Sequence, residues 1–207
     1  MERFIITVAR ETGSGGHNIT RKLSDVLGVP YYDRDLLRKA SEVSGIHERL
    51  FGEADERIGL REMLTPDGVT KARKKVYTGE ILPPDSDDYI STRNLFSFQA
   101  KIIKELADSE SCIIVGKCAD YVLKDYDNVV SVYVEAPRAY CLQRVMERMD
   151  DITLEEADEL ITRTDKYRAD YYKYYTGGNY WTNPVNYDIT INNSRLGDEK
   201  SVQLILQ

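Results

Sequence analysis

The sequence lacks any long apolar run and is poor in cysteine and histidine. Its 207 residues include three cysteines and two histidines. A helix that spans a bilayer needs roughly 20 consecutive apolar residues, so we expect no association with a membrane. The cysteines, Cys112, Cys118 and Cys141, are odd in number and show no CxxC spacing, which argues against a disulfide framework or a zinc site. Reduced thiols of this kind are typical of a cytoplasmic protein.

The chain also lacks an excess of positive charge. It has 28 lysines and arginines against 35 aspartates and glutamates, a net charge of −7. A protein that binds nucleic acid usually presents a basic face, and we therefore expect no nucleic-acid partner. A small anionic ligand is still compatible with this charge, because a few convergent arginines can make one cleft locally positive.

Apolar strand-like runs alternate with helix-like patterns along the chain. The predicted strands are 4–9, 29–32, 112–115, 129–135 and 187–192. Strands that alternate with helices imply a parallel sheet covered on both faces. We therefore predict an α/β protein with a three-layer α/β/α fold, a five-stranded parallel sheet and a single domain over residues 1–207.

Several segment ends carry helix signals. Gly28 follows a periodic apolar segment as a C-cap would. Pro137 stands at the start of another helix, where proline is best tolerated. Thr153 and Glu156 have capping-box spacing and begin a long helix. Residues 46–92 show turn chemistry instead of a clear period, and predict an inserted segment.

The first predicted strand runs into a glycine-rich turn, RETGSGGH at residues 10–17. A phosphate-binding loop has the pattern GxxxxGK[ST], in which backbone N–H groups surround phosphate oxygens and the lysine reaches the β and γ phosphates. Here Gly16 stands in the place of the lysine, and His17 in that of the Ser/Thr. A turn of this kind also arises for purely structural reasons. The candidate phosphate-binding residues are Gly13, Ser14, Gly15, Gly16, His17 and Asn18.

Arg10 occupies the position of the first glycine of that pattern. Arginine binds phosphate well through its bidentate fork, so Arg10 could restore the missing cation. The alternative is a solvated residue at the end of a strand. His17 is open to two interpretations as well, a polar residue at a helix start or a donor to an anion.

Together with this turn, three further segments resemble the cytidylate kinase-like family. They are YYDRDLL at 31–37, IIVGKCADYVL at 113–123 and YDITINNSRLG at 187–197. The resemblance covers nearly the whole chain and is weakest over 46–92. It implies the P-loop nucleoside monophosphate kinase fold and an ATP-dependent phosphoryl transfer, with Mg²⁺, to a small acceptor such as CMP or dCMP. A lysine introduced at position 16 should then raise the affinity for ATP, provided that the loop keeps its usual geometry.

The acceptor side of such a kinase should lie at the carboxyl end of the second strand. There Asp33 could take a ribose hydroxyl or a cytosine amino group, and Arg38 an acceptor phosphate; helix capping is the alternative for Asp33. The family's VEGRD segment resembles VGKC here, with Lys117 for arginine and Cys118 for aspartate. Lys117 and Asp120 are therefore further acceptor-side candidates. The magnesium ligands are undecided, with Asp33 and Asp120 as substitutes for the lost aspartate.

The segment at 160–178 resembles the lid of these kinases, and we expect a lid over residues 153–181. Arg163 and Arg168 match the spaced arginines that stabilise charge on the transferring phosphoryl group. With Arg10 they are the predicted catalytic residues, and Arg163→Ala should lower turnover by more than about tenfold. The alternative is that these arginines lie on solvated helix faces.

Many of the 15 tyrosines gather next to this segment, in YYKYYTGGNYW at 171–181. So many aromatic residues are unusual for a surface helix. They predict packing of the lid on the core or a homodimer contact, and stacking on a base is the alternative.

Two classes of function fit these patterns. The arginines of the lid favour a phosphotransferase of the nucleoside monophosphate kinase type, and we favour this hypothesis. The missing lysine and aspartate favour a non-catalytic protein that binds a nucleotide or phosphate for sensing or regulation. A kinase with a different small acceptor is a third possibility, because residues 46–92 do not look like an orthodox nucleotide-recognition insert.

Overall fold

The computed structural model describes residues 3–57 and 79–207. The strands are β1 (Ile5–Arg10), β2 (Tyr31–Tyr32), β3 (Cys112–Val115), β4 (Val129–Glu135) and β5 (Ile189–Asn192). The helices are α1 (Gly16–Leu27), α2 (Asp35–Ser44), α3 (Glu48–Arg57), α5 (Thr92–Ser109), α6 (Ala119–Val122), α7 (Arg138–Met146), α8 (Leu154–Tyr175) and α9 (Asn193–Ile205), with a 3₁₀ turn at Pro184–Asn186. Of these, α3 and the start of α5 fall within the predicted insert, and residues 58–78 of that insert lie outside the described residues.

The strands form one parallel sheet in the order β2-β3-β1-β4-β5, which confirms the predicted five-stranded parallel sheet. β1 is the central strand, and Ile5 pairs with Cys112 of β3 on one side and with Val129 of β4 on the other. The loop that follows β1 therefore lies at the middle of the carboxyl edge. Parallel sheets bind ligands at this edge, where the strand order reverses.

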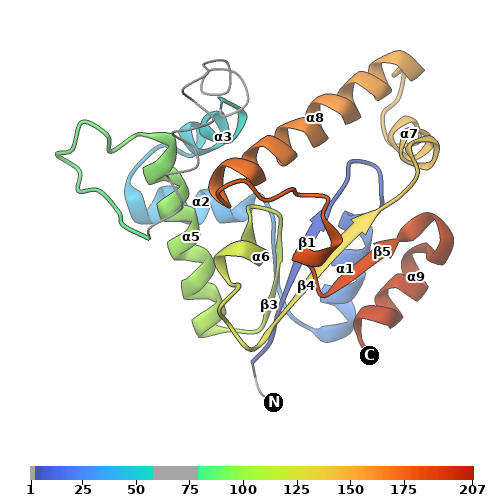
Figure 1. Ribbon diagram of the computed structural model, residues 1–207, viewed down its shortest axis with the longest axis horizontal. Helices are drawn as coiled ribbons and strands as arrows, with labels where there is room; N and C mark the ends of the chain where they lie inside the picture. The colour runs from blue at the N-terminus through green and yellow to red at the C-terminus, as the bar shows by residue number, and fades with distance from the viewer. Residues whose placement is uncertain (1–2, 58–78) are drawn as a thin grey trace.

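Helices cover both faces of the sheet, as predicted (Figure 1). Successive side chains of a strand point to opposite faces. Along β1, Ile5 and Ala9 join a core that includes residues of α5 and α6. Ile6 and Val8 join a second core with residues of α1 and α9. Apart from Thr7 and Arg10, the sequence of β1 is apolar because both of its faces are buried.

The tyrosine-rich end of α8 is packed into the first of these cores. Tyr171, Tyr172 and Tyr175 are buried. The ring of Tyr175 stacks on that of Phe96 in α5 at a centroid distance of 3.7 Å, and its hydroxyl donates to the carbonyl oxygen of Thr92 at 2.9 Å. Of the explanations for the tyrosine cluster, packing on the core is therefore confirmed for these three rings.

Most predicted helix ends are confirmed within one or two residues. The Thr153 hydroxyl accepts from the Glu156 N–H, and the Glu156 carboxylate accepts from the Thr153 N–H, which is the predicted capping box. The last helix, α9, begins at Asn193 directly after β5 and contains a kink at Gly197, whose φ is 75°. Among the described residues, no helix has the length and apolar character that a membrane crossing requires.

Candidate functional site

A cavity of about 450 Å³ lies at the carboxyl ends of β1 and β2. Its walls come from the glycine-rich loop, the end of β2 and the start of α2, and helices α7 and α8. The lining includes five arginines and three carboxylates, so the wall carries an excess of positive charge although the chain is acidic. The arginines are Arg10, Arg34, Arg144, Arg148 and Arg168, and the carboxylates are Glu11, Asp33 and Asp35. The convergence of arginines makes this cavity suitable for an anion.

The loop cannot accommodate a side chain at Gly13 or at Gly15. Gly13 and Gly15 have φ angles of 82° and 95°, which L residues rarely adopt. A Cβ atom on Gly13 would lie 2.5 Å from the carbonyl oxygen of Cys141, and one on Gly15 would lie 2.3 Å from Nδ2 of Asn193. The glycines therefore let the loop backbone pack directly against α7 and the start of α9.

Ser14 holds the loop from within and is fully buried. Its hydroxyl donates to the carbonyl oxygen of Glu11 at 2.9 Å, while its own carbonyl oxygen accepts from Nδ2 of Asn193 at 2.8 Å. The structure thus places the Ser14 side chain on the backbone of the loop, and Ser14 is not among the residues that line the cavity.

The other loop candidates, Gly13, Gly15, Gly16, His17 and Asn18, do line the cavity. Gly16 is the first residue of α1. The first turn of a helix leaves N–H groups without intrahelical partners, and the helix dipole favours negative charge there. The backbone at the start of α1 therefore offers donors to an anion.

Arg10 fills the space above Gly16. A Cβ atom on Gly16 would lie 2.5 Å from Cβ and 2.8 Å from Cγ of Arg10. At the far end of the same side chain, a Cβ on Gly116 would lie 2.7 Å from Arg10 Nη1. The guanidinium then ends beside Asp33, with 3.5 Å between Nη2 and Oδ2. A side chain at position 16 would therefore meet Arg10, which argues against a gain in ATP affinity from a lysine placed there alone; that expectation stays a prediction.

The charge of Arg10 persists at neutral pH in spite of its surroundings. Burial and, to a smaller extent, the nearby Arg168 lower the pKa of Arg10 to about 10, while Asp33 and Asp165 oppose the shift. This pKa is still well above 7. Two guanidinium groups are thus held near each other beside the loop, an arrangement that an anionic ligand would relieve.

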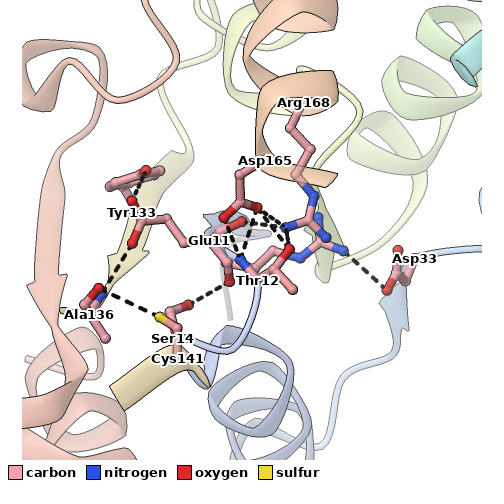
Figure 2. A network of polar contacts seen from close by, with 10 residues as sticks. Glu11, Thr12, Ser14, Asp33, Tyr133, Ala136, Cys141, Asp165 and Arg168 are labelled. Atoms are coloured by element: carbon pink, nitrogen blue, oxygen red, sulfur yellow. Dashed lines mark hydrogen bonds and ion pairs between the residues drawn. The ribbon is translucent and has the colours of Figure 1, made fainter. Parts of the chain in front are cut away.

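The side chains of Thr12, Asp165 and Arg168 form a compact network at the loop. Figure 2 shows Asp165 and Arg168, both from α8, converging on Thr12. The Thr12 N–H donates to Asp165 Oδ1 at 3.0 Å and Oδ2 at 3.1 Å, and the Thr12 hydroxyl donates to Oδ1 at 2.8 Å. Nη1 of Arg168 donates to Asp165 Oδ1, to Thr12 Oγ1 and to the carbonyl oxygen of Arg10, each at 3.0 Å. These bonds join α8 to the loop.

Glu11 joins the loop to β4 and to the short segment between β4 and α7 (Figure 2). Its carboxylate accepts from the Tyr133 hydroxyl at 3.4 Å and from the Ala136 N–H at 3.3 Å. Burial raises the pKa of Glu11, and the negative charge of Asp165 raises it further.

The structure does not bring every predicted site residue to this cavity. Asp33 and Arg168 line it together with Arg10, whereas Arg163 is exposed on α8 and is not among the lining residues. Arg38 is exposed and pairs with Glu42 at 2.8 Å. Lys117 and Asp120 are also outside the lining.

Asp120 has a different environment from the cavity carboxylates. It accepts a hydrogen bond from the Tyr172 hydroxyl at 2.7 Å. Burial raises the pKa of Asp120 to about 6. The bond links α6 to the packed end of α8.

The sequence patterns did not single out Glu11, Thr12 and Asp165, which the structure joins in the network around the loop. Asp165 stands three residues before Arg168, a spacing that places both on one helix face. This spacing was the available signal for Asp165, but nothing in it shows that the partner is Thr12, 153 residues away in the chain.

The sheet order and the glycine-rich loop after the central strand define the P-loop kinase fold. Among solved structures, an uncharacterized protein from Eubacterium ventriosum matches with a TM-score of 0.69 at 24% identity, over 99% of this chain and 96% of that one. A shikimate kinase from Bacteroides thetaiotaomicron matches with a TM-score of 0.52 at 14% identity, over 98% of this chain and 95% of that one. At these identities the likeness shows the fold alone.

The match of the sequence to a family model shows to which family the chain belongs. Residues 5–195 match the model of the Cytidylate kinase-like family, and the chain belongs to this family, as the resemblance predicted. A comparison with curated proteins found no match. Family and fold together support a kinase-type phosphotransferase.

Proposed function

We propose that the protein is an ATP-dependent phosphotransferase that acts on a small acceptor such as CMP or dCMP. The observation that carries this proposal is the course of Arg10, whose side chain fills the space above Gly16 and whose guanidinium lies at the cavity wall. A cation is thus present beside the phosphate-binding loop although the loop has no lysine.

On the donor side, the N–H groups at the start of α1 would hold phosphate oxygens, with Arg10 and Arg168 as the cations. Phosphoryl transfer spreads negative charge over the transferring oxygens, and fixed cations that face this charge lower the barrier. Arg168 is held in place by Thr12 and Asp165 before any ligand enters. Arg163, Lys117 and the lid over 153–181 remain predictions.

A magnesium ion would enter this cavity together with the nucleotide. Among the described residues, no group of three or more His, Cys, Asp or Glu could hold a metal ion. Protein sites for Mg²⁺ commonly use one or two carboxylates together with substrate phosphates. Asp33 and Asp35 line the cavity and would serve as those carboxylates. When bound, the ion would neutralise charge on the phosphate oxygens.

On the acceptor side, Asp33, Arg34 and Asp35 line the cavity between the end of β2 and the start of α2. A carboxylate there can accept a hydrogen bond from a hydroxyl or an exocyclic amino group, both of which CMP has. Arg38 and Asp120 are outside the lining, and their acceptor roles stay predictions, as does the role of 46–92 as an acceptor-side segment.

The test is an assay of ADP release with ATP·Mg²⁺, run with CMP, dCMP and other small phosphate and hydroxyl acceptors. We expect acceptor-dependent ADP release that falls at least about tenfold in Arg10→Ala. Arg21→Ala is the matched control, because Arg21 is an exposed arginine on α1 outside the cavity lining. Full activity of Arg10→Ala would contradict the role of Arg10, and no ADP release with any acceptor would contradict the phosphotransferase.

A second candidate function is a protein that binds nucleotide without turnover. It is favoured by Asp165, whose carboxylate already occupies the Thr12 N–H in the loop. Calorimetric titration separates the two functions: binding of ATP·Mg²⁺ without ADP release would favour the binding protein.

A further inference from the structure

Asp165 is fastened to the phosphate-binding loop by several short bonds. It accepts from the N–H and the hydroxyl of Thr12 and from the guanidinium of Arg168. Its side chain is 21% exposed, and that of Arg168 is 24% exposed, so both are largely withdrawn from water. Bonds between ionised partners that are shielded in this way are stronger than ordinary surface ion pairs.

We propose that Asp165 is a positioning residue, which fixes Arg168 and Thr12 relative to each other so that Arg168 faces the cavity before a nucleotide binds. The proposal deepens the proposed function and rests on it. Asp165 would touch neither the donor nor the acceptor, and would act through Arg168.

The closed arrangement of the bonds supports this role. The Thr12 hydroxyl donates to Asp165 and accepts from Arg168, and Arg168 donates to Asp165 as well. Each of the three side chains is therefore bonded to the other two. A closed ring fixes all three orientations, because no member can rotate without the loss of two bonds.

The packing of α8 supports it as well. Asp165 holds the helix one turn before Arg168, and buried Tyr171 and Tyr175 hold it in the following turns. Arg168 is thus anchored from both directions along its helix. A cation that is placed in advance needs no reorganisation during the reaction, which is how fixed charges contribute most to catalysis.

The charge of Asp165 allows an opposite effect, which makes the proposal testable. A carboxylate beside an anion site also repels the anion and competes for Thr12. If Asp165 mainly blocks the site, its neutralisation will tighten anion binding. If Asp165 mainly positions Arg168, its neutralisation will weaken anion binding and will make Arg168 dispensable.

The experiment is a double-mutant cycle on the affinity for pyrophosphate, measured by calorimetry, because this probe requires no turnover. In the wild-type background we expect Arg168→Ala to weaken binding at least about tenfold. In the Asp165→Asn background the same change should cost less than about threefold. Asp170→Asn is the matched control background, since Asp170 lies on the same helix, pairs with Lys166 and is not among the lining residues. There the tenfold effect of Arg168→Ala should persist.

Thermal unfolding of each variant shows whether it folds. If Asp165→Asn does not fold, Asp165→Glu, which keeps the charge, replaces it in the cycle. An equal effect of Arg168→Ala in both backgrounds, or tighter pyrophosphate binding by Asp165→Asn, would overturn the positioning role. Absence of pyrophosphate binding by the wild type would overturn it together with the phosphate site. Coupling between Asp165 and Arg168 without ADP release for any acceptor would leave the positioning role standing and overturn only the phosphotransferase.

Discussion

Arg10 and Gly16 exclude each other's side chains, because a Cβ atom on Gly16 would lie 2.5 Å from Cβ of Arg10. The loop departs from the usual phosphate-binding pattern at two positions, with Arg10 in place of the first glycine and Gly16 in place of the lysine. These two replacements depend on each other. An arginine at the end of β1 brings the cation across Gly16, and position 16 has to be glycine because a Cβ there would meet the Arg10 side chain. The missing lysine is in this respect a consequence of Arg10.

We therefore predict that lysine at position 16 is not tolerated while Arg10 is present. We expect Gly16→Lys to lower the free energy of unfolding by about 1–3 kcal/mol, as other overpacked cores do, and to bring no gain in ATP affinity. Arg10→Gly combined with Gly16→Lys recreates the GxxxxGK pattern and should recover both stability and nucleotide binding. Denaturant unfolding and calorimetry measure the two properties.

Gly52→Ala in α3 is the control for this series, because a Cβ there meets no atom of the described part of the chain within 4 Å. It should leave stability unchanged or slightly raise it. A stable Gly16→Lys protein with tighter ATP binding would show that Arg10 can move aside, and would contradict this dependence.

Arg168 and Arg163 should differ in their effect on catalysis. Arg168 lines the cavity, and Arg163 is exposed outside its lining. We expect Arg168→Ala to lower kcat by more than about tenfold through the loss of a cation that faces the phosphates, and Arg163→Ala to have the smaller effect. Steady-state kinetics of the two variants decide this. A larger loss in Arg163→Ala would indicate that α8 moves toward the cavity during turnover.

The tyrosines of α8 should matter for stability. We expect Tyr175→Ala to lower the free energy of unfolding by about 3 kcal/mol or more, because it removes a buried ring that stacks on Phe96. Tyr175→Phe should cost only about 1 kcal/mol, the value of its hydrogen bond to Thr92. Tyr180→Ala is the exposed control. Urea denaturation gives all three values, and a neutral Tyr175→Ala would argue against this packing.

Asp120 should make stability depend on pH. The ordinary pKa of this carboxyl, 3.8, applies to the unfolded chain, and burial raises it to about 6 in the folded protein. Between these values the folded state binds more protons, so the free energy of unfolding falls as pH rises through this window. The free energy of unfolding should fall by on the order of 2–3 kcal/mol in total, and the fall should be complete slightly above pH 6.

Asp120→Asn should remove this dependence, because the amide cannot ionise and still accepts from Tyr172. Urea unfolding between pH 4 and pH 8 measures the effect, with Asp125→Asn as an exposed control that should behave as the wild type. Parallel pH profiles of wild type and Asp120→Asn would show that the carboxyl titrates normally.

The sequence was sufficient for the order of elements and for the sheet. Runs such as 112–115 are apolar throughout because parallel strands are buried on both faces, and this pattern is local. End signals such as the capping box at Thr153 also act within one turn, so they could be located by spacing. The shortest strand, β2, covers only Tyr31–Tyr32 of the predicted residues 29–32.

The site was only partly determined by the sequence. The loop, Asp33 and Arg168 could be named because each belongs to a local pattern. The sequence did not determine that Arg10 passes over Gly16, that Asp165 holds Thr12, or that Arg163 and Asp120 lie outside the cavity lining. Those relations join residues far apart in the chain, and they depend on how α7, α8 and α9 pack around one loop. Tertiary packing decided them, because the direction of a side chain in space is set by its distant neighbours as well as by its own segment.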